Sequence, residues 1–194
     1  SDEWIQEIQD AMPEMPGERR ARYTNNLGLS AYDAMVLTQT KEMSDFFEEA
    51  VKDGGDPKRV ANYLMNDVNS YLNDKQVDLQ DTKLTPANLA GMVKLIEDGT
   101  ISSKMAKKVF KGILDGEEPN AYAKEHGLVQ LSDPAQLQPI VDEVLDNNEQ
   151  SIEDFKNGKD RAVGYLMGQI MKQTRGKANP QVVTQLLMKS LKAK

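Results

Sequence analysis

The sequence contains no cysteine and only one histidine, His126, among 194 residues. Without cysteine there is no disulfide framework, no thiolate nucleophile and no thiolate metal site, and one histidine excludes a site built on two. Aromatic residues make up only 6% of the chain, so Leu, Val, Ile and the 10 Met must fill the core. Redox chemistry and a two-histidine metal site are therefore disfavoured.

Long apolar runs are also missing. No stretch of about 18 apolar residues occurs, and the start, Ser1-Asp2-Glu3-Trp4, is acidic where a signal peptide would be basic. We therefore expect no membrane span, no export signal and a cytoplasmic location. The first residues have a helical pattern that Ser1 could cap, which suggests a fragment of a longer protein or, alternatively, a trimmed N-terminus.

Charge is distributed unevenly along the chain. The formal net charge is -7, yet residues 156–194 contain nine Lys and Arg against one acid, Asp160, which gives this end +8 and the remainder -15. A split of this kind indicates different partners for the two ends, and the basic end suits polyanions.

Apolar residues recur at helical spacing along nearly the whole chain, which predicts an all-α fold. Expected helices cover about residues 40–52, 57–73, 86–98, 103–115, 133–147, 160–175 and 180–191, with a short helix around 152–155. Near the start, Pro13 and Pro16 predict a turn between an amphipathic segment and a short basic helix. Residues 77–84 have the weakest pattern.

The short basic helix carries Arg19, Arg20 and Arg22. These arginines could form a second contact for anions. We favour the alternative, in which they lie on a solvated face and pair with nearby glutamates.

Breaks cluster near residues 116–133, where Gly116, Pro119 and Gly127 follow in quick succession and Pro134 comes directly after. This cluster predicts a hinge between two helical domains. The expected domains are residues 1–127, of which about 1–39 form an N-terminal connector, and a smaller tail domain, residues 128–194.

Catalytic patterns are sparse. A loop or helix-capping role is favoured for His126 over acid-base chemistry, and carboxylate pairs such as Glu48-Glu49 have no special spacing. The sequence has no phosphate-binding Gly-rich loop, no dinucleotide fingerprint and no nucleophile elbow. We therefore predict no catalytic, cofactor-binding or metal-binding residues, and no enzyme activity for the chain by itself.

The most informative segment is 160–175. At 100° per residue, one narrow stripe contains Arg161, Tyr165, Gly168, Lys172 and Arg175, while Val163, Leu166, Met167 and Ile170 lie opposite. Gly168 permits close approach of another backbone. With Gly164 it forms a Gly-x-x-x-Gly pair, for which tight packing of a neighbouring helix is the alternative.

The same helix is expected to end at Gly176, and Asn179-Pro180 is expected to begin the next one. The N-H groups of that second helix, together with Arg175 and Lys177, would attract phosphate. The alternative is an ordinary helical hairpin whose cations complement a helix C-terminus.

Three segments in this region resemble the signature of the GatB/YqeY family, namely FKNGK (155–159), GYLMGQIMK (164–172) and GKANP (176–180). Upstream, MPEMP (12–16) and RARY (20–23) are similar to the region beyond the catalytic cradle of the longer family members. The resemblance covers essentially the whole chain.

The longer members are B subunits of tRNA-dependent amidotransferases, which convert Glu-tRNA(Gln) or Asp-tRNA(Asn) to the amide with glutamine and ATP. The resemblance therefore implies tRNA and the A and C subunits as partners, with ATP and Mg²⁺ held in a cradle that has no counterpart here. It also implies a helical domain followed by a mobile, YqeY-like tail that binds the tRNA elbow on its D-loop side.

The resemblance further implies which residues contact tRNA. These are Lys156, Lys159, Arg161, Gln169, Lys172, Arg175, Lys177 and Asn179. The family often has Lys where Arg175 stands, and both bind phosphate, although Arg can do so bidentately. An apolar residue is common where Tyr165 stands, so packing is an alternative to stacking there. The competing hypothesis for the chain is a helical protein-interaction module whose basic face docks an acidic partner.

Overall fold

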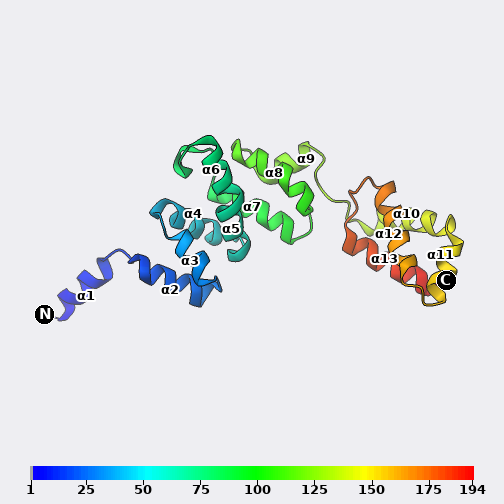
Figure 1. Cartoon of the computed structure of the whole chain (residues 1–194), viewed down its shortest axis with the longest axis horizontal. Coiled ribbons are helices and arrows are strands. Elements are labelled where there is room, and N and C mark those ends of the chain that lie inside the picture. Colours follow the sequence, from blue (N-terminus) through cyan, green and yellow to red (C-terminus); the bar gives the residue numbers. More distant parts are fainter. Residues whose placement is uncertain (1) are drawn as a thin grey trace. The chain divides into compact units, whose positions relative to one another are not determined.

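The computed structural model describes residues 2–194 and confirms the all-α prediction (Figure 1). Within residues 2–194 no strand forms, and only one isolated bridge, between Leu131 and Ala178, has β geometry. The predicted cap at Ser1 lies outside the described residues. The helices divide into two compact units, one up to Lys94 with Gly112–Pro119, the other Leu95–Lys111 with Asn120–Lys194.

The first unit contains a succession of short helices. They are α1 (Asp2–Ala11), α2 (Pro16–Leu27), α3 (Ala31–Leu37), α4 (Lys41–Lys52), α5 (Pro57–Tyr63), η1 (Leu64–Val68), α6 (Asn69–Lys75), η2 (Leu79–Asp81) and most of α7 (Pro86–Glu97). Side chains of Ser30, Thr40 and Asp56 cap α3, α4 and α5 by accepting backbone N–H groups. Buried Tyr23 packs edge-on against Phe47, with ring centroids 4.9 Å apart.

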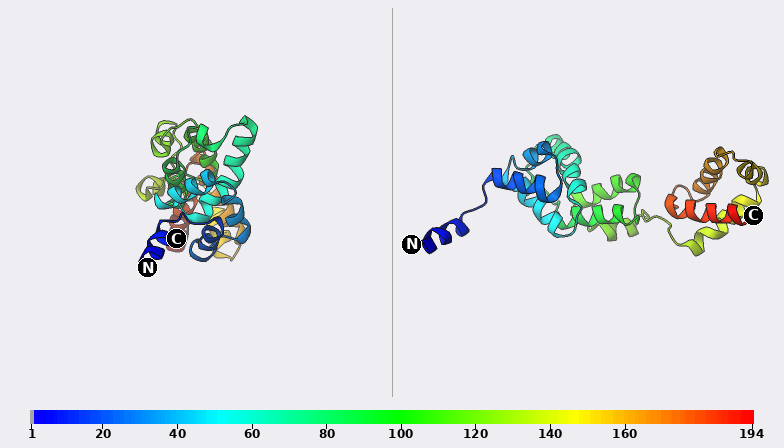
Figure 2. Two further views of the ribbon diagram at one scale, coloured as in Figure 1. Left: turned by 90° about the vertical axis from the view of Figure 1, so that its left-hand side faces the viewer. Right: turned by 90° about the horizontal axis from the view of Figure 1, so that it is seen from below.

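The second unit contains most of α8 (Ser103–Leu114) and α9 (Pro119–Glu125), followed by four further helices. These are α10 (Pro134–Asp146), α11 (Glu149–Lys156), α12 (Arg161–Gln173) and α13 (Pro180–Ala193). Helices α10, α12 and α13 pack pairwise, and the right-hand view of Figure 2 shows this group from another side. Their shared core includes fully buried Leu137, Leu145, Leu166, Ile170 and Leu187.

The burial of one side of α12 in this core fixes the rotation of the helix about its own axis. Truncating one fully buried leucine to alanine typically costs about 2–5 kcal/mol. Because Leu166 and Ile170 are both 0% exposed, rolling α12 about its axis would lose several such contacts at once. The direction in which its other side faces is therefore set by the core.

The observed helices differ from the predicted ones in three details. The expected helix over 57–73 contains five residues of π-helix, η1, between α5 and α6. The region predicted only as breaks contains α9, because Pro119 is its first residue, where a missing N–H is tolerated.

The third difference is the end of α12, which lies at Gln173 and not near Gly176. Thr174 closes the helix by donating its hydroxyl to the Ile170 carbonyl (3.0 Å). Arg175 then adopts φ 55°, and Gly176 φ 75°, so the chain has left helical geometry two residues early. The N–H of Gly176 bonds to the Met171 carbonyl at 2.8 Å, which satisfies one of the last carbonyls of the helix.

Within the first unit, a cluster of charges connects the proline-containing turn, α2 and α4. Arg22 donates to both oxygens of Glu14, at 2.9 and 2.7 Å, and also contacts Glu48. Arg19 pairs with Asp45 at 2.9 Å and with Glu14 at 3.3 Å. Pairing with nearby acids is therefore confirmed for Arg19 and Arg22, but both side chains are partly buried and do not lie on a solvated face.

The hydrogen bond from Arg22, with smaller contributions from Arg19, lowers the pKa of Glu14 below its usual value despite partial burial. A carboxylate with a lowered folded-state pKa stabilises the fold above its unfolded pKa, and this contribution is lost as pH falls through the folded pKa. We expect Glu14→Gln to lower the free energy of unfolding of the first unit by about 1 kcal/mol at pH 7.

The measurement is urea unfolding followed by near-UV circular dichroism, which reports on buried Tyr23. The difference between wild type and Glu14→Gln should shrink as the pH falls below the usual range of a glutamate pKa and through the lowered pKa of folded Glu14, because the folded carboxylate then takes up a proton. Glu7→Gln on exposed α1 is the matched control and should change stability at neither neutral nor acidic pH. An equal loss at neutral and acidic pH would show that Glu14 acts through packing and not through charge.

Candidate nucleic-acid interface

The exposed side of α12 is the centre of the candidate interface. Ala162, Leu166 and Ile170 are buried in the tail core, which leaves Arg161, Tyr165, Gly168 and Lys172 facing outwards. The predicted stripe is thus confirmed for these four residues. Tyr165 is 52% exposed, so it is not a core side chain.

Four cations in this region have no side-chain partner anywhere in residues 2–194. Arg161 and Lys172 lie on α12, while Arg175 and Lys177 follow in the turn before α13. All four are exposed. An unpaired cation can exchange its water and counterions for a phosphate without first breaking a bond within the protein.

Two other predicted contacts already have partners within the tail. The ammonium of Lys156 donates to the backbone oxygen of Lys194 at 2.8 Å. Lys159 pairs with Asp154 at 3.2 Å, and this hydrogen bond lowers the pKa of the Asp154 carboxyl. Such exposed pairs are weak, so the partners lower the availability of these two lysines without removing it.

The glycines of α12 decide between the two explanations given for the Gly-x-x-x-Gly pair. A Cβ atom added at Gly164 or at Gly168 would meet nothing within 4 Å. Neither glycine therefore packs against another helix of the second unit, so tight helix packing within this unit does not explain the pair. The α12 backbone is open to close approach between Arg161 and Lys172.

The turn between α12 and α13 is built largely by Asn179. Its side-chain oxygen caps α13 by accepting the Gln181 N–H at 3.0 Å, and its amide donates to the Ser132 hydroxyl at 3.3 Å. Its backbone N–H donates to Leu131 at 2.8 Å, and the Leu131 N–H donates to Lys177 at 2.7 Å. Asn179 therefore shapes the turn on which the side chains of Arg175 and Lys177 remain free.

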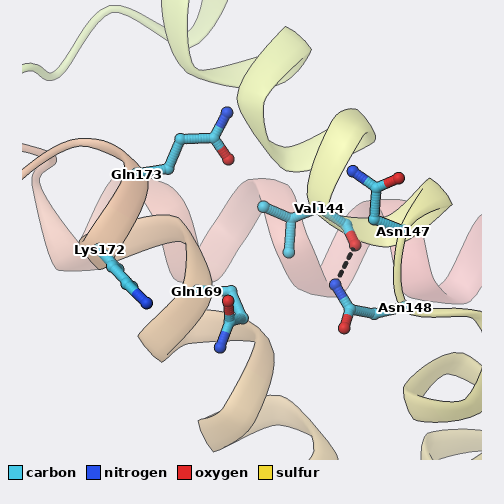
Figure 3. A pocket seen from close by; sticks show the side chains of 6 residues that line it. All are labelled: Val144, Asn147, Asn148, Gln169, Lys172 and Gln173. Atoms are coloured by element: carbon cyan, nitrogen blue, oxygen red, sulfur yellow. Dashed lines mark hydrogen bonds between the residues drawn. The ribbon is translucent and has the colours of Figure 1, made fainter.

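A polar groove of about 390 Å³ lies beside α12 (Figure 3). Its lining comes from the end of α10, the start of α11 and the second half of α12, and consists of Val144, Asn147, Asn148, Gln169, Lys172 and Gln173. The structure thus brings the predicted contacts Gln169 and Lys172 together with three amide side chains that sequence reasoning did not select.

The structure also shows a second basic face, on α8, that the sequence analysis did not identify. It consists of Lys104, Lys107, Lys108 and Lys111, all exposed and without a partner among the described side chains. Their spacing follows helical periodicity, with Val109 and Ile113 buried on the other side. The sequence signal was present in KxxKKxxK, but it was obscured by the strongly negative charge of residues 1–155.

Features that would indicate catalysis are few in the described part of the chain. His126 stacks on Tyr122 and lies 3.0 Å, through Nδ1, from the Tyr122 carbonyl, which is a local structural role. No three acidic or histidine side chains in residues 2–194 are grouped so that they could bind a metal ion. No helix described here is both long enough and apolar enough to cross a bilayer.

Comparison with known proteins identifies the family. Residues 45–191 match the family model described as the GatB domain. The chain is 94% identical over its full length to the B subunit of the aspartyl/glutamyl-tRNA(Asn/Gln) amidotransferase of Limosilactobacillus reuteri (strain DSM 20016), of which it covers 41%. It is 80% identical over 190 residues to the corresponding protein of Limosilactobacillus fermentum and 69% identical over 193 residues to that of Pediococcus pentosaceus.

Coverage is 98% of this chain and 40% of the relative for the L. fermentum protein, and 100% and 41% for the P. pentosaceus protein. The chain therefore spans about two fifths of the length of these relatives. The residues matched by the family model include α10, α11, α12 and α13 up to residue 191, with the cationic face of α12, the turn and the groove. On this match, and on the full-length identity to B subunits, the chain belongs to the GatB domain family.

Proposed function

We propose that this chain is a non-catalytic tRNA-binding and positioning module of a tRNA-dependent amidotransferase. In this role it forms the C-terminal part of a B subunit that works in the cytoplasm with A and C subunits. The complete enzyme converts Glu-tRNA(Gln) and Asp-tRNA(Asn) to Gln-tRNA(Gln) and Asn-tRNA(Asn). ATP and Mg²⁺ bind in the longer protein outside this chain, and the tail binds the elbow of the tRNA on its D-loop side.

The observation that carries the proposal is the set of four unpaired cations on α12 and the following turn. Arg161, Lys172, Arg175 and Lys177 are exposed, whereas the ion pairs that would neutralise them are absent from the described residues. The open glycines between Arg161 and Lys172 let a bulky backbone approach the helix. Double-stranded RNA is recognised mainly through its shape and its phosphates, which suits a surface of this kind.

The names of the relatives support the same ligand. Each similar protein is part of an amidotransferase that acts on tRNA(Asn/Gln), and the chain matches about 41% of such a protein. A polyanion contact within a protein of this type is most simply the tRNA. The competing hypothesis, an acidic protein docked on the basic face, predicts that tRNA does not bind the isolated chain.

Substitution of single lysines tests the contact. We expect Lys172→Ala and Lys177→Ala each to weaken binding of a tRNA(Gln) transcript about tenfold, because a charge-assisted hydrogen bond is worth about 1.5 kcal/mol. Fluorescence anisotropy with the 194-residue chain gives the Kd. Lys75→Ala, which removes an exposed lysine at the end of α6, is the matched control and should leave the Kd unchanged.

If both Lys172→Ala and Lys177→Ala bind as tightly as wild type, α12 and its following turn are not the tRNA contact. If wild type itself shows no binding, the tRNA hypothesis for the chain fails and docking of an acidic protein becomes the better explanation. Helicity by circular dichroism should be unchanged in every variant, since none of these lysines packs in a core.

Backbone strain at Arg175 allows a test in which stability and binding move in opposite directions. Arg175 and Gln76 are the only non-glycine residues of the described chain with positive φ, both at 55°. A left-handed conformation costs a side-chain-bearing residue about 1–2 kcal/mol, part of which glycine recovers. We expect both Arg175→Gly and Gln76→Gly to raise thermal stability slightly, while only Arg175→Gly weakens tRNA binding.

Comparing Arg175→Gly with Gln76→Gly shows whether the arginine at this strained position binds tRNA or has no part in binding. If Arg175→Gly stabilises the chain and leaves the Kd for tRNA unchanged, the guanidinium is not a tRNA ligand. Thermal melts and anisotropy on the same preparations give both quantities.

A further inference from the structure

The groove beside α12 combines one cation with four amide side chains. Asn147 and Asn148 come from the α10–α11 junction, and Gln169 and Gln173 from successive turns of α12, with Lys172 between them. Among residues 2–194 no carboxylate lines it, although Glu143 lies close enough to accept a hydrogen bond from Gln173 at 2.8 Å. A simple anion site would be expected to offer more than one cation.

Most of the hydrogen-bonding capacity of these amides is unused. Asn148 donates to the Val144 carbonyl at 2.7 Å, which leaves its oxygen free. The side chains of Asn147 and Gln169 make no hydrogen bond to any described residue. In Figure 3 the amide ends of Gln169 and Asn148 lie below Val144, and those of Asn147 and Gln173 lie above it. The groove therefore presents amide donors and acceptors on both sides of Val144, together with one cation, Lys172.

This combination fits an unpaired nucleobase. Each amide has a donor and an acceptor in one plane, which matches the edge of a base, and Asn and Gln are the side chains that bind adenine bidentately. Single-stranded RNA is recognised through bases that are turned out of the stack and hydrogen-bonded along their edges. Lys172, shared by the groove and the cationic face, is placed to bind the phosphate of the same nucleotide.

We propose that the groove formed by Asn147, Asn148, Gln169, Lys172 and Gln173 is a pocket for one unpaired base of the bound tRNA. This inference rests on the proposed function and adds to it. Phosphate contacts along α12 position the RNA but carry no sequence information, whereas the amides read one base directly. Val144 supplies the apolar surface against which the ring packs.

The test uses the 194-residue chain, an unmodified tRNA(Gln) transcript and the substitution Gln169→Leu, which removes the amide and keeps most of the volume. Gln185→Leu on exposed α13 is the matched control. We expect Gln169→Leu to raise the Kd at least about fivefold, the lower limit for one lost bidentate base contact. The salt dependence of binding should stay the same, since no charge is removed.

Base-specific chemical probing and hydroxyl-radical footprinting provide the direct readout. In the wild-type complex we expect the edge of one unpaired base to be protected, and Gln169→Leu should expose that base while the backbone footprint persists. Backbone protection without any protected unpaired base would overturn the pocket and leave the proposed function intact. Absence of both footprints in wild type would overturn the proposed function and, with it, the pocket.

Discussion

Burial of one side of α12 is the constraint on which the functional surface depends. Leu166 and Ile170 are wholly enclosed by α10 and α13, so the opposite side of the helix must face outwards. The outward side carries cations, an exposed tyrosine and two glycines with open space above them. The core therefore presents a charged and sterically open surface without any ligand to organise it. The same packing brings the amides of α12 beside the α10–α11 junction and creates the groove.

The turn after α12 extends this surface through the backbone. Thr174 ends the helix, and Arg175 accepts a left-handed conformation that usually belongs to glycine. The turn is then held by paired backbone bonds between Leu131 and residues 177 and 179, and residue 130 bonds to the Thr100 carbonyl at 2.6 Å. A strained arginine on a braced turn is positioned in advance, which lowers the entropy lost when it binds a ligand.

Much of the second unit could be predicted from the sequence, because its signals are local. Asn179 caps α13 as expected, α10 covers most of the helix expected over 133–147, and the amphipathic pattern of α12 places Lys172 correctly. The early end of α12 could not be predicted, since arginine gives no sign that it will take a positive φ. Nor could the groove, which forms only when Asn147 and Asn148 meet a helix about 20 residues further along the chain. Nothing in the apolar spacing of 57–73 marks the π-helical segment.

The most direct test of the central claim, that the unpaired cations of the tail bind RNA phosphates, is the salt dependence of tRNA binding by the intact 194-residue chain. Each phosphate contact releases a little less than one counterion. With four contacts, a plot of the logarithm of the association constant against the logarithm of the salt concentration should have a slope of about -3 to -4. Titrations of a tRNA(Gln) transcript at several salt concentrations give this slope. A value near that prediction supports the cationic face of α12 and its turn as the contact, and a slope near zero would contradict it.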